Sequence, residues 1–182
     1  MQFEFTILDF IQKNLRTPVG DTLLPIISAL VHHGELWIAL MLIFLAFPKT
    51  RKCGITLAAA LLLEAVIVNL ILKPLVTRIR PYDINTSVKL IISPLTDYSF
   101  PSGHTAVSFA AAAVLFSDKN FLRYPALVFS LTVAFSRLYL YVHYPTDVFA
   151  GMLIGVNVNE KVYHLLAKKL TTMLTKKLTT CY

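Results

Sequence analysis

The segment from Ser136 to Asp147 carries the side chains best suited to chemistry. It places a guanidinium, an imidazole and a carboxylate between two apolar runs. Pro145 suits the first turn of a helix, and His143 and Asp147 are four residues apart, so they share one face if the helix begins near His143. A carboxylate bonded to one imidazole nitrogen leaves the other nitrogen free to attack or to accept a proton. Arg137 could clamp a phosphate from the end of the preceding helix.

Taken alone, this segment also fits a belt of Arg, Tyr and His at a membrane surface. Two further clusters favour chemistry. The segment from Lys73 to Pro81 ends one apolar run, and Pro101-Ser-Gly-His104 opens the next. In chain order the three clusters have the patterns Lys-x6-Arg-Pro, Pro-Ser-Gly-His and Ser-Arg-x5-His-x3-Asp, each at the expected end of a helix.

This set of motifs resembles the type 2 phosphatidic acid phosphatase superfamily, which includes bacterial lipid phosphatases and the vanadium haloperoxidases. All three motifs match without a gap or a substitution, and they span residues 73–147. The resemblance implies that His143 is a nucleophile that forms a phosphohistidine and that Asp147 orients it. It also implies that His104 protonates the leaving oxygen and then activates the water that cleaves the intermediate.

The remaining motif residues suit binding of the phosphoryl group. Lys73, Arg80 and Arg137 would neutralise its equatorial oxygens. Ser102 could cap the helix that starts there, with its hydroxyl and the Gly103 N–H directed at the anion. These three cations require no metal, and we expect no cofactor. We expect Arg78, which is not a fixed position of its motif, to contact lipid head groups at the rim.

Composition favours a single membrane domain over residues 1–182, with a motif-bearing core at 54–165. Hydrophobic residues make up 56% of the 182 residues, charged residues make up 15%, and the mean hydropathy is +0.66. The net charge is +7, and the basic residues lie between apolar runs. This distribution indicates membrane topology and not nucleic-acid binding. We expect no disulfide between Cys53 and Cys181, because both fall on the predicted cytoplasmic side.

The apolar runs predict an all-α, integral-membrane bundle of about six transmembrane helices, with an amphipathic helix at 3–14 on the inner surface. The six segments are 18–31, 36–47, 54–73, 103–117, 122–140 and 145–165. Residues 23–47 could be one span, but we favour a loop at His32–Glu35, because four such residues in mid-bilayer are costly. Adjacent histidines do not share a helix face, so His32 and His33 do not indicate a metal site. Glu64 should face the bundle in a packing role.

Basic residues predict the orientation. The loops 48–52 and 118–123 and the C-terminal tail hold ten of the 17 Lys and Arg residues, so they should face the cytoplasm. All three motifs then lie at the outer face, with the loop 82–100 over them. Basic residues on that face are exceptions to the positive-inside rule, and binding of an anionic partner would explain their presence there. The cations are Lys73, Arg78, Arg80, Lys89 and Arg137.

These observations predict a multi-pass membrane enzyme that hydrolyses a lipid phosphate or diphosphate. A compact chain with an outward site most resembles the undecaprenyl-diphosphate phosphatases, whereas phosphatidylglycerophosphate and phosphatidate phosphatases have the same motifs. A non-catalytic anion transporter or binding protein would use the same cations but would not need an oriented imidazole. The haloperoxidases are soluble, unlike this apolar chain.

Overall fold

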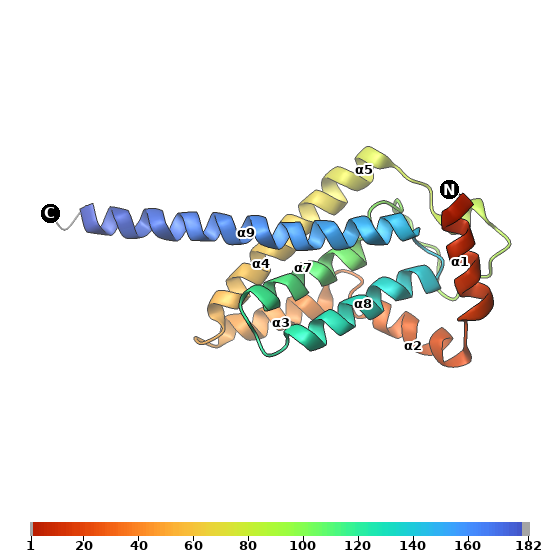
Figure 1. The fold of residues 1–182 in the computed structure, drawn as a ribbon, viewed down its shortest axis with the longest axis horizontal. Coiled ribbons are helices and arrows are strands. Elements are labelled where there is room, and N and C mark those ends of the chain that lie inside the picture. Colours follow the sequence, from red (N-terminus) through yellow and green to blue (C-terminus); the bar gives the residue numbers. More distant parts are fainter. Residues whose placement is uncertain (1, 180–182) are drawn as a thin grey trace.

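The computed structural model describes the backbone of residues 2–179 and the side chains of residues 2–163. Helices are the only regular elements within these residues (Figure 1). They are α1 (Gln2–Asn14), α2 (Pro18–Ala29), α3 (Glu35–Ala46), α4 (Arg51–Ala65), the π-helix η1 (Val66–Leu72), α5 (Lys73–Val76), α6 (Pro81–Ile84), α7 (Gly103–Ser117), α8 (Arg123–Tyr139) and α9 (Pro145–Thr179). The prediction of an all-α chain is therefore confirmed for the described residues.

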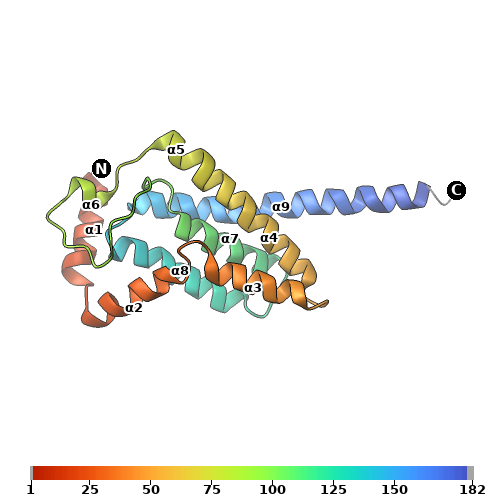
Figure 2. The same ribbon diagram turned by 180° about the vertical axis from the view of Figure 1, so that it is seen from behind.

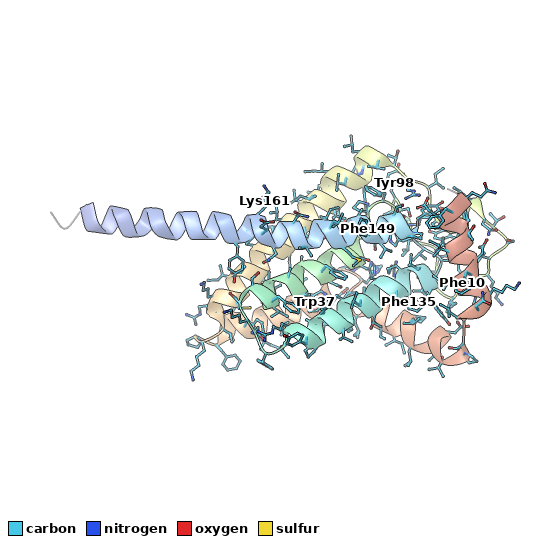
Figure 3. The ribbon with its side chains drawn as sticks, in the orientation of Figure 1. Phe10, Trp37, Tyr98, Phe135, Phe149 and Lys161 are labelled. Carbon is cyan, nitrogen blue, oxygen red and sulfur yellow. The ribbon has the colours of Figure 1, made fainter. Side chains whose placement is uncertain are left out.

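Helix α7 is the centre of the bundle. It packs against α9, α8 and α4, and ten of its 15 residues are buried. Close approach to α9 depends on small residues, because a Cβ atom added at Gly155 would clash with the Ala106 carbonyl oxygen. Outside this core, large apolar side chains such as Phe149 and Phe135 point away from the bundle (Figure 3). Such an apolar exterior is suited to contact with lipid.

The turn between α2 and α3 interrupts one passage through the bundle. Gly34 adopts a left-handed conformation with φ of 81°, and Leu36 N donates a hydrogen bond to Leu30 O at 3.0 Å across the break. The two helices then continue in the same direction and do not fold back as a hairpin (Figures 1 and 2). The loop at His32–Glu35 was predicted correctly. The two helices that it joins nevertheless make a single passage.

The described chain therefore passes from one end of the bundle to the other five times, through α2 with α3, α4 to α5, α7, α8 and α9. Among the described residues, one stretch, Arg51–Ile84, is long and apolar enough to cross a bilayer by itself. A broken passage such as α2 with α3 is tolerated in a membrane where its irregular backbone is buried in protein or lines a cavity. Helix α9 continues to Thr179, beyond the predicted end at residue 165.

The position predicted for the N-terminal helix is wrong. Glu4 of α1 accepts a hydrogen bond from Arg78 at 2.7 Å, and Gln12 donates one to Tyr139 O at 2.7 Å, so α1 lies at the end of the bundle that holds the motifs. The predicted cytoplasmic loops lie at the opposite end (Figure 1). An amphipathic helix suits either membrane surface, and only its packing decides which one. In this fold Leu8 and Ile11 pack against the residues around Tyr141.

This arrangement predicts which positions share a side of the membrane. In a Cys53→Ser, Cys181→Ser background, single cysteines at Gln2 and Ser87 should react with a membrane-impermeant thiol reagent on intact cells. A cysteine at Thr50 should react only after permeabilisation, because the Lys and Arg of its loop resist translocation. Labelling of Gln2→Cys together with Thr50→Cys would contradict the placement of α1. The reverse pattern for Ser87 and Thr50 would put the motifs on the inner side.

Candidate active site

Six of the eight predicted site residues line one cavity of about 910 Å³. Four chain segments bring them together. They are the segment from the start of α5 to the residue before α6, the N-terminus of α7, the last turn of α8, and the loop before α9. The six residues are Lys73, Arg80, Gly103, His104, Arg137 and His143. Asp147 and Ser102 lie behind the wall of the cavity.

His143 is fixed by a backbone carbonyl. Its Nδ1 lies 2.7 Å from Ser99 O, and because a carbonyl oxygen only accepts hydrogen bonds, Nδ1 carries the proton. The Nε2 atom, 3.4 Å from Arg80 Nη1, then keeps its lone pair. Burial and the positive charges of Arg80, Arg137 and Lys73 hold the pKa of His143 well below its usual value of 6.5. The imidazole is therefore neutral near pH 7, as a nucleophile must be.

Asp147 acts on His143 less directly than its spacing predicted. Its Oδ2 atom is 3.6 Å from His143 Nδ1, too far for a hydrogen bond. The same oxygen accepts hydrogen bonds from Ser99 Oγ at 2.6 Å and from Tyr144 N at 2.9 Å. Helix α9 begins only at Pro145, so His143 precedes it. Asp147 therefore positions the loop and Ser99, and the Ser99 carbonyl positions His143.

Arg137 is the most buried cation of the site. Its Nη1 donates to Ser28 Oγ, whereas Nε and Nη2 have no hydrogen-bond partner among the described residues. Buried guanidinium donors are costly to leave without a partner, so this part of the cavity is prepared for an anion. Ser28 belongs to α2, and no sequence motif indicated its role.

The loop between α6 and α7 supplies the counter-ion of the other two cations. Asp97 pairs with Lys73, and its Oδ1 atom lies 2.5 Å from Arg80 Nη2. Burial alone would raise the pKa of Asp97, but Lys73 and Arg80 lower it to about 2, so the carboxylate stays ionised at neutral pH. Residues 93–97 line the cavity, as expected for a loop over the site. A phosphoryl group that binds both cations would compete with Asp97.

The N-terminus of α7 meets the prediction only in part. Gly103 and His104 line the cavity, but the Ser102 hydroxyl is within 2.9 Å of Thr105 Oγ1 and Ser102 does not line the cavity. The expectation that this hydroxyl faces the anion is therefore not met. Ser102 is fully buried against α9, and its backbone N–H donates to Asp147 O at 3.1 Å. It joins two motifs through the backbone.

Arg78 does not lie at the rim, contrary to the prediction. Its Nη1 donates to Asp147 Oδ1 at 2.5 Å, its Nη2 donates to Glu4 Oε2 at 2.7 Å, and its guanidinium stacks 3.9 Å from the centre of the Tyr144 ring. Nη1 also donates to Thr146 Oγ1 at 2.7 Å. Arg78 thus connects helix α1 to the carboxylate of the third motif. The sequence missed it because its partners are 69 and 74 residues away.

Two polar groups that the sequence left without a role also reach the cavity. Glu64 is buried as expected and lines the cavity, and its Oε1 atom has no hydrogen-bond partner among the described residues. His32, expected to belong to a plain loop, lines the cavity with its ring 5.6 Å from the ring of His104. No spacing pattern links the turn after α2 to the start of α7, so this contact could not be predicted from the sequence.

Comparison with known proteins decides the family. Residues 53–170 match the PAP2 superfamily. This chain belongs to the PAP2 superfamily. The resemblance carried by the three motifs is therefore confirmed over about two thirds of the chain.

The names of relatives within the superfamily indicate different substrates. The chain is 34% identical over 120 residues to the undecaprenyl-diphosphatase of Sulfolobus acidocaldarius (65% of this chain, 58% of that protein). It is 40% identical over 128 residues to the decaprenylphosphoryl-5-phosphoribose phosphatase of Mycolicibacterium smegmatis (68% of each). The crystal structure of Aquifex aeolicus LpxE superposes with a TM-score of 0.76 at 28% identity, over 89% of this chain and 95% of that one. The chain spans only 50% to 66% of several other curated relatives.

The contacts of Arg78 predict a stability difference between two arginine variants. Arg78→Gln would leave the carboxylates of Asp147 and Glu4 without their guanidinium partner, at a cost of about 3 kcal/mol. Arg16→Gln removes a partly exposed pair with Asp21 and should cost less than about 1 kcal/mol. Thermal unfolding of both variants in the same detergent measures the difference. Equal melting temperatures for the two variants would contradict the proposed role of Arg78.

Proposed function

We propose that this protein is a metal-independent lipid phosphatase or diphosphatase that works through a phosphohistidine at the outer membrane face. One observation carries the proposal. The Nε2 atom of a neutral His143 faces a cavity that also holds His104 and the cations Lys73, Arg80 and Arg137. A cavity for anion binding alone needs the cations but not an imidazole whose tautomer is fixed by Ser99 O, which disfavours the transporter alternative.

In the proposed reaction the three cations hold the equatorial oxygens of the phosphoryl group. The lone pair of His143 Nε2 attacks phosphorus and forms a P–N bond while the bond to the leaving oxygen breaks. His104 donates its proton to that oxygen. A water that has transferred a proton back to His104 then attacks the phosphohistidine, releases inorganic phosphate and restores His143.

The other part of the cavity suits a lipid chain. Apolar side chains from α3, α4 and α7 line it, namely Ile38, Met41, Leu61, Leu62 and Val107. We propose undecaprenyl diphosphate as the substrate, because a prenyl diphosphatase is among the relatives and the motif end of the bundle should face outward. Phosphatidylglycerophosphate and phosphatidate are the alternatives, since their phosphatases share the motifs.

The proposed location is the cell membrane, crossed several times. The motif residues and the basic loops 48–52 and 118–123 lie at opposite ends of the bundle, which supports this proposal (Figure 1). With the basic loops in the cytoplasm, a lipid head group in the outer leaflet reaches the cavity while its chain stays in the bilayer.

Substitution of the two histidines tests the mechanism. Purified protein should release phosphate from undecaprenyl diphosphate faster than from phosphatidylglycerophosphate or phosphatidate. His143→Ala should reduce release by at least about 1,000-fold, because no P–N bond can form. His104→Ala should slow turnover strongly and allow a phosphoenzyme to accumulate. A folded His143→Ala protein with near-normal phosphate release would show that His143 is not the nucleophile.

Inhibitors test the electrostatic part of the mechanism. EDTA should leave activity unchanged, because the three cations hold the phosphoryl oxygens, and vanadate should inhibit as a phosphate mimic. The measurement is phosphate release at several concentrations of each reagent, with buffer alone as the control. Loss of activity with EDTA that magnesium restores would overturn the metal-independent mechanism.

A further inference from the structure

The turn between α2 and α3 places the exposed side chain of His32 in the lining of the cavity, beside His104. Its ring lies 5.6 Å from the ring of His104, and Val31 and Gly34 beside it also line the cavity. The His32 imidazole has no hydrogen-bond partner among the described residues, whereas the neighbouring His33 has its Nδ1 3.1 Å from Glu35 Oε1. The left-handed Gly34 and the bond from Leu36 N to Leu30 O hold this turn in place.

The geometry of phosphoryl transfer assigns this position to the leaving group. In an in-line displacement the leaving oxygen is opposite the attacking nitrogen, here His143 Nε2, and it faces the proton donor His104. The atoms bonded to that oxygen therefore lie on the His104 side of the phosphoryl group. The His32 imidazole lies beside His104, with the two ring centroids 5.6 Å apart.

What lies there depends on the substrate class. When the terminal phosphoryl group of a lipid diphosphate is transferred, the leaving group is a lipid monophosphate, and its anionic oxygens lie beside the leaving oxygen. When a phosphomonoester is hydrolysed, the leaving group is an alcohol without charge. An unpaired imidazole N–H at this position can hydrogen-bond the first leaving group and has no anionic partner in the second.

We propose that His32 binds the departing phosphate of a lipid diphosphate and so makes this protein prefer diphosphates to monophosphates. The inference rests on the proposed phosphatase function and narrows its substrate class. The P–O bond to the bridging oxygen breaks, the proton of His104 goes to that oxygen, and His32 donates a hydrogen bond to a non-bridging oxygen of the departing phosphate. Glu64 lines the same cavity, nine residues before Lys73 in the sequence.

The test compares a prenyl diphosphate with the prenyl monophosphate of the same chain length, in the same detergent. His32→Ala should lower the ratio of the two kcat/KM values, diphosphate over monophosphate, by about 10- to 100-fold, the range for a hydrogen bond to a charged group. His32→Asn keeps an N–H donor and should give an intermediate ratio. Asn157→Ala removes an exposed polar side chain of α9 that does not line the cavity, so it is the control and should keep the wild-type ratio.

Inhibition by vanadate separates this effect from general damage to the site. Vanadate mimics the transferred group only, so its inhibition constant should be similar in wild-type and His32→Ala protein. A wild-type ratio in His32→Ala would overturn the role of His32, whether or not both rates fall. Release of phosphate by the wild-type protein from the monophosphate alone would also overturn the role of His32. In that case the proposed phosphatase function would still stand. Release from neither prenyl substrate, nor from any other lipid of the panel, would contradict both.

Discussion

Arg137 is buried in an apolar helix bundle with two of its guanidinium nitrogens unpaired, and the architecture of the site depends on this constraint. A cation in such surroundings is tolerated only next to polar groups, and the protein provides one hydroxyl, from Ser28. Lys73 and Arg80 add two more positive charges, for which Asp97 is the nearby carboxylate. The site is therefore short of negative charge, which an incoming phosphoryl group supplies.

The same charges prepare the proposed nucleophile, His143. Because Arg80, Arg137 and Lys73 surround a buried His143, a protonated imidazole is unfavourable there and the neutral form persists. The Ser99 carbonyl fixes which nitrogen carries the remaining proton, and Asp147 holds Ser99. Helix α1 belongs to this arrangement through Glu4 and Arg78, so the N-terminal segment supports the loop that carries His143 in addition to covering the end of the bundle.

The interruption between α2 and α3 adds a polar side chain to the lining of the cavity. A continuous helix would satisfy its own backbone and present one apolar stripe, whereas the turn at His32–Gly34 brings a polar ring within 5.6 Å of the His104 ring. Trp37, just after the turn, donates a hydrogen bond to Ser108 Oγ at 3.1 Å and anchors α3 to α7. The cavity thus has both cationic and apolar lining residues, as a lipid with a charged head requires.

The sequence alone determined the helices and the motif residues. Long apolar runs and helix-breaking prolines and glycines are local signals, so the start and end of α7 were predicted at Gly103 and Ser117 and most other boundaries to within a few residues. The motifs are equally local, since each lies within twelve residues. Their family was recognised from residue types and spacing, and six of the eight predicted residues line the cavity.

Tertiary structure decided what depends on contacts between distant segments. The Ser99 carbonyl that holds His143 comes from 44 residues away, and a backbone oxygen has no signature in a sequence. Asp97 and Glu4 are ordinary acidic residues until folding brings them to Lys73 and Arg78. The side of the bundle that α1 covers and the contact of His32 with His104 were equally hidden, because amphipathicity fixes which face of a helix is buried but not the partner that buries it.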